Sequence, residues 1–290
     1  MKLSYIALVC FLLSHFTSFS QKKESLKGNK IPETKTVEIT PYKILEVDQN
    51  FEILLVQQEE PRVRIDADSN LHDFITVKVD AEKLHIRSSV TFSRFKKLYV
   101  EVGYNKELAQ IIANDKAVIR GNTALVTDRT ELTVNDNAEV ELHFRSDFVE
   151  VKANGKSRTT TSIEAQNIVF TLKDDSKVSG EAITESLNIQ MDQKSELTLS
   201  GSAQKSNYFI NGSCKYYGGQ LVAGQTLINI TGKSECFLNT TDKLKVNAID
   251  ESETHILGNP LIELEAFSNE ATLFKTEKTS SNGFKNIFSK

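Results

Sequence analysis

Six aspartates recur in short polar segments of this chain, and their carboxyl groups are the side chains best suited to acid–base chemistry. They are Asp115, Asp136, Asp174, Asp175, Asp192 and Asp250. Two carboxyl groups about 5 to 9.5 Å apart in a cleft can hydrolyse a glycosidic bond, and Asp174 and Asp192 lie close to one repeat apart. Asp also favours turns, because its short side chain bonds nearby backbone. We expect the turn role here.

The histidines and cysteines form no recognisable motif for metal binding or nucleophilic catalysis. Outside the N-terminal segment the histidines are His72, His85, His143 and His255, and none lies in a cluster with metal-ligand spacing. A Gly-x-Ser-x-Gly motif and the glycine-rich calcium-binding nonapeptide are missing from the sequence. We therefore expect no catalytic residue, no cofactor and no metal.

Cys214 and Cys236 follow the N-terminal segment, and an exported protein would favour a disulfide between them. The repeat described below offsets them by one unit and two residues. Strand spacing then places their Cα atoms about 8 Å apart, beyond the reach of about 7 Å for a disulfide. The sequence predicts two buried, reduced thiols.

Five aromatic residues gather in two or three successive units, and alternation predicts which of them face solvent. Tyr208 and Tyr216 fall on the inward side, and the outward candidates are Phe209, Tyr217 and Phe237. An aromatic ring face can cover the C–H face of a sugar. These three residues are therefore the candidate ligand-binding site for a glycan or a partner, and the alternative is that they are covered by the rest of their units.

All of these residues belong to a unit of about 19 residues that occurs nine times. Each unit contains a short polar turn followed by a small residue: Ala117, Ala138, Ser157, Ser176, Ser195, Cys214, Ser234, Ser252 and Ala271. Apolar residues precede each turn at alternate positions. A period this regular predicts stacked coils, in which each unit buries its face against its neighbours.

The residues after each turn predict strands with one solvent-exposed face. The position directly after the small residue is charged in seven of nine units: Val118, Glu139, Arg158, Lys177, Glu196, Lys215, Glu235, Glu253 and Thr272. Stacking places four oppositely charged pairs side by side in this column, and the two like-charge contacts are Arg158 with Lys177 and Glu235 with Glu253. We expect each coil to consist of a strand, a three-residue corner, a strand and a variable return. In the last unit Glu265 falls in an inward column, and Phe267 adds an apolar residue that requires a bulge.

The N-terminus has the pattern of a secretory signal peptide over residues 1–20. Lys2 precedes an apolar stretch from Ile6 to Leu13, and the sequence predicts cleavage between Ser20 and Gln21. A transmembrane anchor is the alternative, although the apolar run is short for one. The formal net charge of −4 becomes −5 without these residues, which argues against a nucleic-acid partner.

The remaining organisation is a flexible lead (21–35), an N-terminal β region (36–105), the β-solenoid repeats (106–275) and a polar C-terminal tail or cap (276–290). The N-terminal β region contains the progression Val47 to Gln58, Arg62 to Val79, Lys83 to Ile86 and Leu98 to Val102, before Ile111-Ile112-Ala113-Asn114-Asp115. This pattern resembles the head GIN domain family (DUF2807) of Bacteroidota, whose members are labelled auto-transporter adhesins. The resemblance covers about residues 37–275. It implies an all-β, right-handed parallel β-helix or β-solenoid, a secreted or envelope location and no established activity.

These observations favour an exported, non-enzymatic, adhesin-like binding protein of unknown ligand, in the periplasm, on the cell surface or outside the cell. Its partner would be a glycan or an envelope protein. The alternative is a structural envelope protein that self-assembles into a homo-oligomer through the open end of its sheet. A carbohydrate-active β-helix enzyme is the third interpretation, since fold alone does not establish function.

Overall fold

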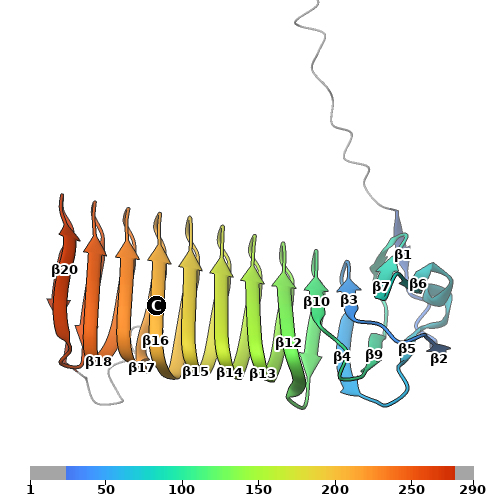
Figure 1. The fold of residues 1–290 in the computed structure, drawn as a ribbon. Coiled ribbons are helices and arrows are strands. Elements are labelled where there is room, and N and C mark those ends of the chain that lie inside the picture. Colours follow the sequence, from blue (N-terminus) through green and yellow to red (C-terminus); the bar gives the residue numbers. More distant parts are fainter. Residues whose placement is uncertain (1–23, 278–290) are drawn as a thin grey trace, which may run out of the picture.

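The computed structural model describes residues 24–277, which form a parallel β-solenoid with additional strands at its N-terminal end (Figure 1). The N-terminal elements lie at one end of the row of coils, and β20 lies at the other. The signal peptide prediction and most of the predicted tail fall outside the described residues. The N-terminal elements are β1 (Ser25–Lys27), β2 (Pro32–Glu38), β3 (Ile44–Val47), β4 (Glu52–Gln57), β5 (Arg62–Asp68), η1 (Ser69–Phe74), β6 (Ile75–Asp80), β7 (Lys83–Ser88), β8 (Thr91–Ser93) and β9 (Leu98–Tyr104).

The solenoid coils follow, and the central strands of 14 to 16 residues are longer than those of 4 to 7 residues at either end. They are β10 (Gln110–Ala113), β11 (Val118–Gly121), β12 (Leu125–Val134), β13 (Glu139–Ala153), β14 (Arg158–Leu172), β15 (Lys177–Met191), β16 (Glu196–Ile210), β17 (Lys215–Ile230), β18 (Glu235–Ala248), β19 (Glu253–Leu257), β20 (Leu261–Phe267) and β21 (Thr272–Lys275). All pairings between successive coils are parallel. The predicted solenoid of about nine coils is confirmed.

The predicted variable return is wrong for the coils of β13 to β18, whereas breaks do follow β11 and β19. Leu142, Phe144 and their counterparts continue the alternation past the predicted second strand, so one strand runs through to the next turn. The ladder skips one residue in each coil, at Asp147, Gln166 and Glu185. The halves of the strand before and after the skipped position, the two walls of the coil, contribute side chains to the same interior, as Tyr216 and Tyr208 do.

The turns are held in place by hydrogen bonds between coils, and this explains the recurring aspartates. Asp115, Asp136, Asp174 and Asp250 adopt positive φ angles between 59° and 63°, the left-handed conformation that Asp tolerates better than most residues. Their carboxylates accept backbone N–H groups of an adjacent turn, for example Asp115 N to Asp136 Oδ2 at 3.1 Å. At the start of the same corner, asparagine side chains form a further ladder: Asn154 to Asn135 to Asn114 to Asp48.

The core is the continuous inner space between the two walls. The inward columns from Ile111 to Val246 and from Ala113 to Ala248 are buried, as are the small residues after the turns up to Ser252. Near the middle, the rings of Tyr208 and Tyr216 meet across this space with their centroids 5.0 Å apart. Cys214 and Cys236 are free and buried, so this prediction is confirmed.

The coil geometry begins earlier in the chain than the sequence repeat indicated. β3 pairs in parallel with β10, and β4 pairs in parallel with β11. Gln49, between β3 and β4, has the positive φ of the later turns. The predicted flexible lead is also too long, because β1 pairs with β8 and β2 pairs with β5. β2 is an almost fully exposed edge strand; its second half lies in the predicted β region, whereas its first residues, from Pro32, lack apolar alternation.

In the last coil, Glu265 does not occupy the inward column that the sequence predicted for it. A register shift between Val246 and Asn247 places Leu264, and not Glu265, opposite Val246. Glu265 is the extra residue of this bulge, and its carboxylate accepts hydrogen bonds from Lys245 and Asn247. The predicted bulge is therefore present, and it keeps Phe267 opposite Ala248.

Candidate functional site

The three aromatic candidates lie on adjacent strands but not on one wall of the solenoid. Phe209 lies in β16 before a turn, and 55% of its surface is exposed. Tyr217 in β17 and Phe237 in β18 follow their turns and are half-buried. The structure brings Tyr217 and Phe237 together, with ring centroids 5.7 Å apart and an interplanar angle of 23°. Phe209 belongs to the other half of the coil.

Tyr217 and Phe237 are the first two rings of an aromatic ladder that continues to the C-terminal end. Parallel pairing places His255 beside Phe237 and Phe274 beside His255. The Phe237 and His255 centroids are 4.3 Å apart with planes at 10°, and those of His255 and Phe274 are 4.9 Å apart at 19°. Because the rings stack on one another, their broad faces are directed along the ladder and not toward solvent.

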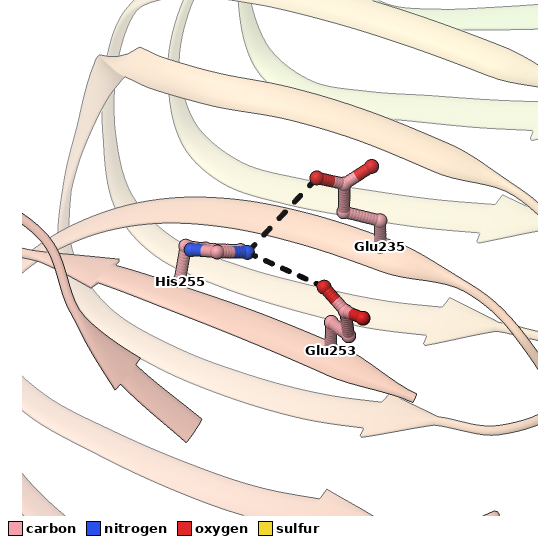
Figure 2. Close-up of side chains that lie close together, drawn as sticks. All are labelled: Glu235, Glu253 and His255. Atoms are coloured by element: carbon pink, nitrogen blue, oxygen red, sulfur yellow. Dashed lines mark ion pairs between the residues drawn. The ribbon is translucent and has the colours of Figure 1, made fainter. Parts of the chain in front are cut away.

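His255 of this ladder lies close to two glutamates of the neighbouring outward column, Glu235 and Glu253 (Figure 2). His255 Nε2 is 4.0 Å from Glu235 Oε1 and 3.8 Å from Glu253 Oε2. The side chain of His255 is 19% exposed, against 31% for Glu235 and 53% for Glu253. Lys215 Nζ lies 3.9 Å from Glu235 on its other side.

Sequence reasoning paired Glu235 with Glu253 but missed the third member of this cluster. Metal-ligand motifs are recognised in a sequence between residues that are close along the chain, whereas the stacking of coils brings Glu235 and His255 together. The available signal was the position of His255, two residues after Glu253 and therefore on the same outward face.

The recurring aspartates have structural contacts that account for their positions. Asp174 Oδ2 accepts the N–H of Gly155 at 2.9 Å, and Asp192 Oδ1 accepts the side-chain N–H of Asn211 at 3.2 Å. Asp175 follows Asp174 in the same turn and is exposed. These contacts favour the turn interpretation over a pair of catalytic acids.

The comparison with known proteins decides the family. The model of the family described as "Putative auto-transporter adhesin, head GIN domain" (DUF2807) matches residues 41–184 and 156–260. This chain belongs to that family. The resemblance stated from the sequence is thus confirmed. No curated protein matches the chain.

Solved structures share the fold of this head GIN domain protein at low sequence identity. A putative adhesin from Parabacteroides merdae is 19% identical, with a TM-score of 0.64, and the match covers 88% of this chain and 100% of that one. A putative adhesin from Parabacteroides distasonis is 19% identical, with a TM-score of 0.65, covering 87% and 100%. A structure titled "Putative lipid binding protein" from the same organism is 18% identical, with a TM-score of 0.62, covering 87% and 100%.

The described surface of the head GIN domain protein is hollowed along the solenoid. One hollow of about 510 Å³ lies along the bends of β13 to β16 and is lined by residues such as Arg145, Glu164 and Ile183. It is open to solvent along its length. Among residues 24–277, no helix is long and apolar enough to cross a membrane.

Proposed function

We propose that this head GIN domain protein is an exported, non-catalytic binding protein of the cell envelope, and that it binds an extended polypeptide strand at the C-terminal end of its solenoid. The observation that carries the proposal is the exposure of large apolar side chains on the last coil. Leu261 is 65% exposed, Leu264 54%, Phe274 44%, Phe267 42% and Ile262 40%.

The two ends of the solenoid differ in how their strand edges are covered. At the N-terminal end, β3 and β4 pair with β7 and β9, which themselves pair with the antiparallel strands β6 and β5. At the C-terminal end, β20 pairs only with β18, and β21 pairs only with β19, among the described residues. An edge of this kind offers a row of backbone N–H and C=O groups to another strand.

A polypeptide strand matches this surface in both backbone and side chains. Strand addition supplies main-chain hydrogen bonds, and alternate side chains of the added strand can pack on Ile262 and Leu264, which share one face of β20. A contiguous exposed apolar surface is itself typical of a binding site. The names of the family and of the similar structures support binding in preference to catalysis.

A peptide array tests this proposal with a matched pair of variants. Leu264→Lys places a charge on the last coil, and Val126→Lys changes a residue of similar exposure, 52%, on β12 near the other end. The chain from residue 21 and its Val126→Lys variant should bind ten-residue peptides of alternating apolar pattern, and Leu264→Lys should lose at least about tenfold in affinity, typical of a disrupted apolar anchor. Equal binding by both variants, or no peptide binding, would refute the proposal.

Sedimentation of the same samples examines the self-assembling alternative. A concentration-dependent dimer that Leu264→Lys abolishes would show that the added strand comes from a second copy. A monomer at all concentrations would indicate that the same surface binds a polypeptide other than a second copy.

Glycan binding is a second candidate function, and it is favoured by the surroundings of Phe209. This exposed ring lies in register between Gln190 and Asn229, whose amides can bond sugar hydroxyls. A glycan array should separate Phe209→Ala from a Tyr217→Ala/Phe237→Ala double variant. Binding lost in Phe209→Ala alone would support a site on that wall, and binding lost only in the double variant would support the aromatic ladder. Absence of glycan binding would reject this candidate.

A further inference from the structure

We propose that Glu235, Glu253 and His255 form a binding site for a divalent transition-metal ion of the zinc class. The three side chains converge on the outward face of β18 and β19 (Figure 2). This inference goes beyond the proposed function and does not depend on it, because none of the three ligands belongs to the last coil; that coil contributes only Phe274 and Thr276, which contact the imidazole of His255.

The geometry already brings one ligand atom from each residue together. The three atoms all lie within 4.8 Å of one another. In a tetrahedral site with bonds of about 2.0–2.2 Å, neighbouring ligand atoms are about 3.3–3.6 Å apart. The distances of 3.8 and 4.0 Å from His255 Nε2 therefore need to shorten by only a few tenths of an ångström. Both glutamate side chains are partly exposed and can make this adjustment.

The histidine is oriented to present a ligand atom at this point. His255 Nδ1 lies 3.4 Å from the hydroxyl of Thr276, and a proton on Nδ1 can be donated to that oxygen. Nε2 then carries the lone pair, and this atom is buried without a hydrogen-bond partner. The rings of Phe237 and Phe274 stack on both faces of the imidazole. Such contacts around a ligating histidine fix its tautomer and orientation.

The local charge also favours a bound cation. The column runs Lys215, Glu235, Glu253 and Thr272, so two carboxylates are adjacent with one lysine at the far side of Glu235. Like charges directly opposite on neighbouring strands are unfavourable. The distances of 3.8 and 4.0 Å from His255 Nε2 are too long for hydrogen bonds to either carboxylate. A metal ion would satisfy all three groups together.

The ligand types select the class of metal. An imidazole nitrogen with two carboxylates suits zinc and related first-row ions, whereas calcium and magnesium take oxygen ligands. Three protein ligands leave at least one coordination position for water or an incoming group. Glu253 is more than half exposed, so an ion can enter from solvent.

Calorimetric titration of the chain from residue 21 with zinc chloride, at neutral pH and without chelators, tests the site. Glu235→Gln and Glu253→Gln each remove a charge while keeping the side-chain shape, and His255→Gln removes the nitrogen ligand. Glu196→Gln is the matched control, since Glu196 occupies the same outward column and pairs with Lys177 at 2.9 Å. Cobalt(II) absorption in the visible range gives a second readout of coordination.

We expect one zinc ion per chain in the wild type and in Glu196→Gln, with affinity reduced at least about tenfold in each of the three site variants, the scale typical for disrupted metal sites. The cobalt spectrum should weaken in parallel. Absence of zinc binding, zinc binding that the three site variants leave unchanged, or binding of calcium in place of zinc would overturn the proposal.

Discussion

The buried tyrosine pair predicts that the protein loses stability at alkaline pH. Tyr208 and Tyr216 are fully buried, and their hydroxyl oxygens lie 3.3 Å apart. Burial raises the pKa of Tyr208 to about 12, from 10.0 in a solvated tyrosine. The perturbation is an increase in pH from 8 to 12, compared between the wild type and Tyr208→Phe, which has no ionisable hydroxyl at that position.

The sign and size follow from proton linkage. Above pH 10 the unfolded chain releases the tyrosine proton while the folded chain retains it, so the free energy of unfolding decreases as pH rises. Each pKa unit corresponds to about 1.4 kcal/mol. A pKa difference of about two therefore removes about 2.7 kcal/mol between pH 10 and pH 12. Below pH 10 this contribution is fully present.

Urea unfolding at pH 8, 10, 11 and 12 measures the effect. Across this range the free energy of unfolding of Tyr208→Phe should rise by about 2.7 kcal/mol relative to that of the wild type. Tyr217→Phe is the control, and it should shift less because the ring of Tyr217 is half-solvated. A difference between the wild type and Tyr208→Phe that stays constant from pH 8 to 12 would refute the reasoning.

Three further predictions concern the interior of the solenoid. Phe170→Ala, at a fully buried position, should lower the free energy of unfolding by about 3–5 kcal/mol, measured by urea unfolding. Gly180→Ala should cost at least about 1–3 kcal/mol in the same assay, because the added Cβ would overlap the carbonyl oxygen of Thr161; an unchanged midpoint would contradict this. Burial raises the pKa of the Cys214 and Cys236 thiols, so both should resist a thiol reagent at neutral pH until the protein unfolds, and rapid native labelling would contradict this.

The coil architecture was predictable because its cause is local and repeated. Each inward residue of the column from Ile111 to Val246 lies beside the residue at the equivalent position of the next coil. A two-residue alternation and a 19-residue period therefore specify its burial. The free state of Cys214 and Cys236 follows from the same register. The bulge at Glu265 was also recognisable, because the apolar pattern gains one residue there.

The remaining features depend on contacts that have no period in the sequence. β2 is an edge strand, and its pairing with β5 is set by backbone hydrogen bonds between mostly exposed residues. The grouping of Phe209 with Tyr217 failed because alternation gives the inward or outward side but not the wall of the coil. His255 was overlooked because its partners come from stacking, and its ring orientation depends on Phe274 and Thr276, which are contributed by the following coil.

The one-to-one register of the coils gives the protein an adjustable length. Eight strand spacings separate the first sequence repeat from the last, which corresponds to about 38 Å along the solenoid. Residues 158–176 form one complete period, from the start of β14 to the small residue after the next turn. Loss or duplication of such a period would shorten or lengthen the rod by about 4.8 Å while both ends kept their composition. The length of the solenoid is therefore set by the number of its repeats.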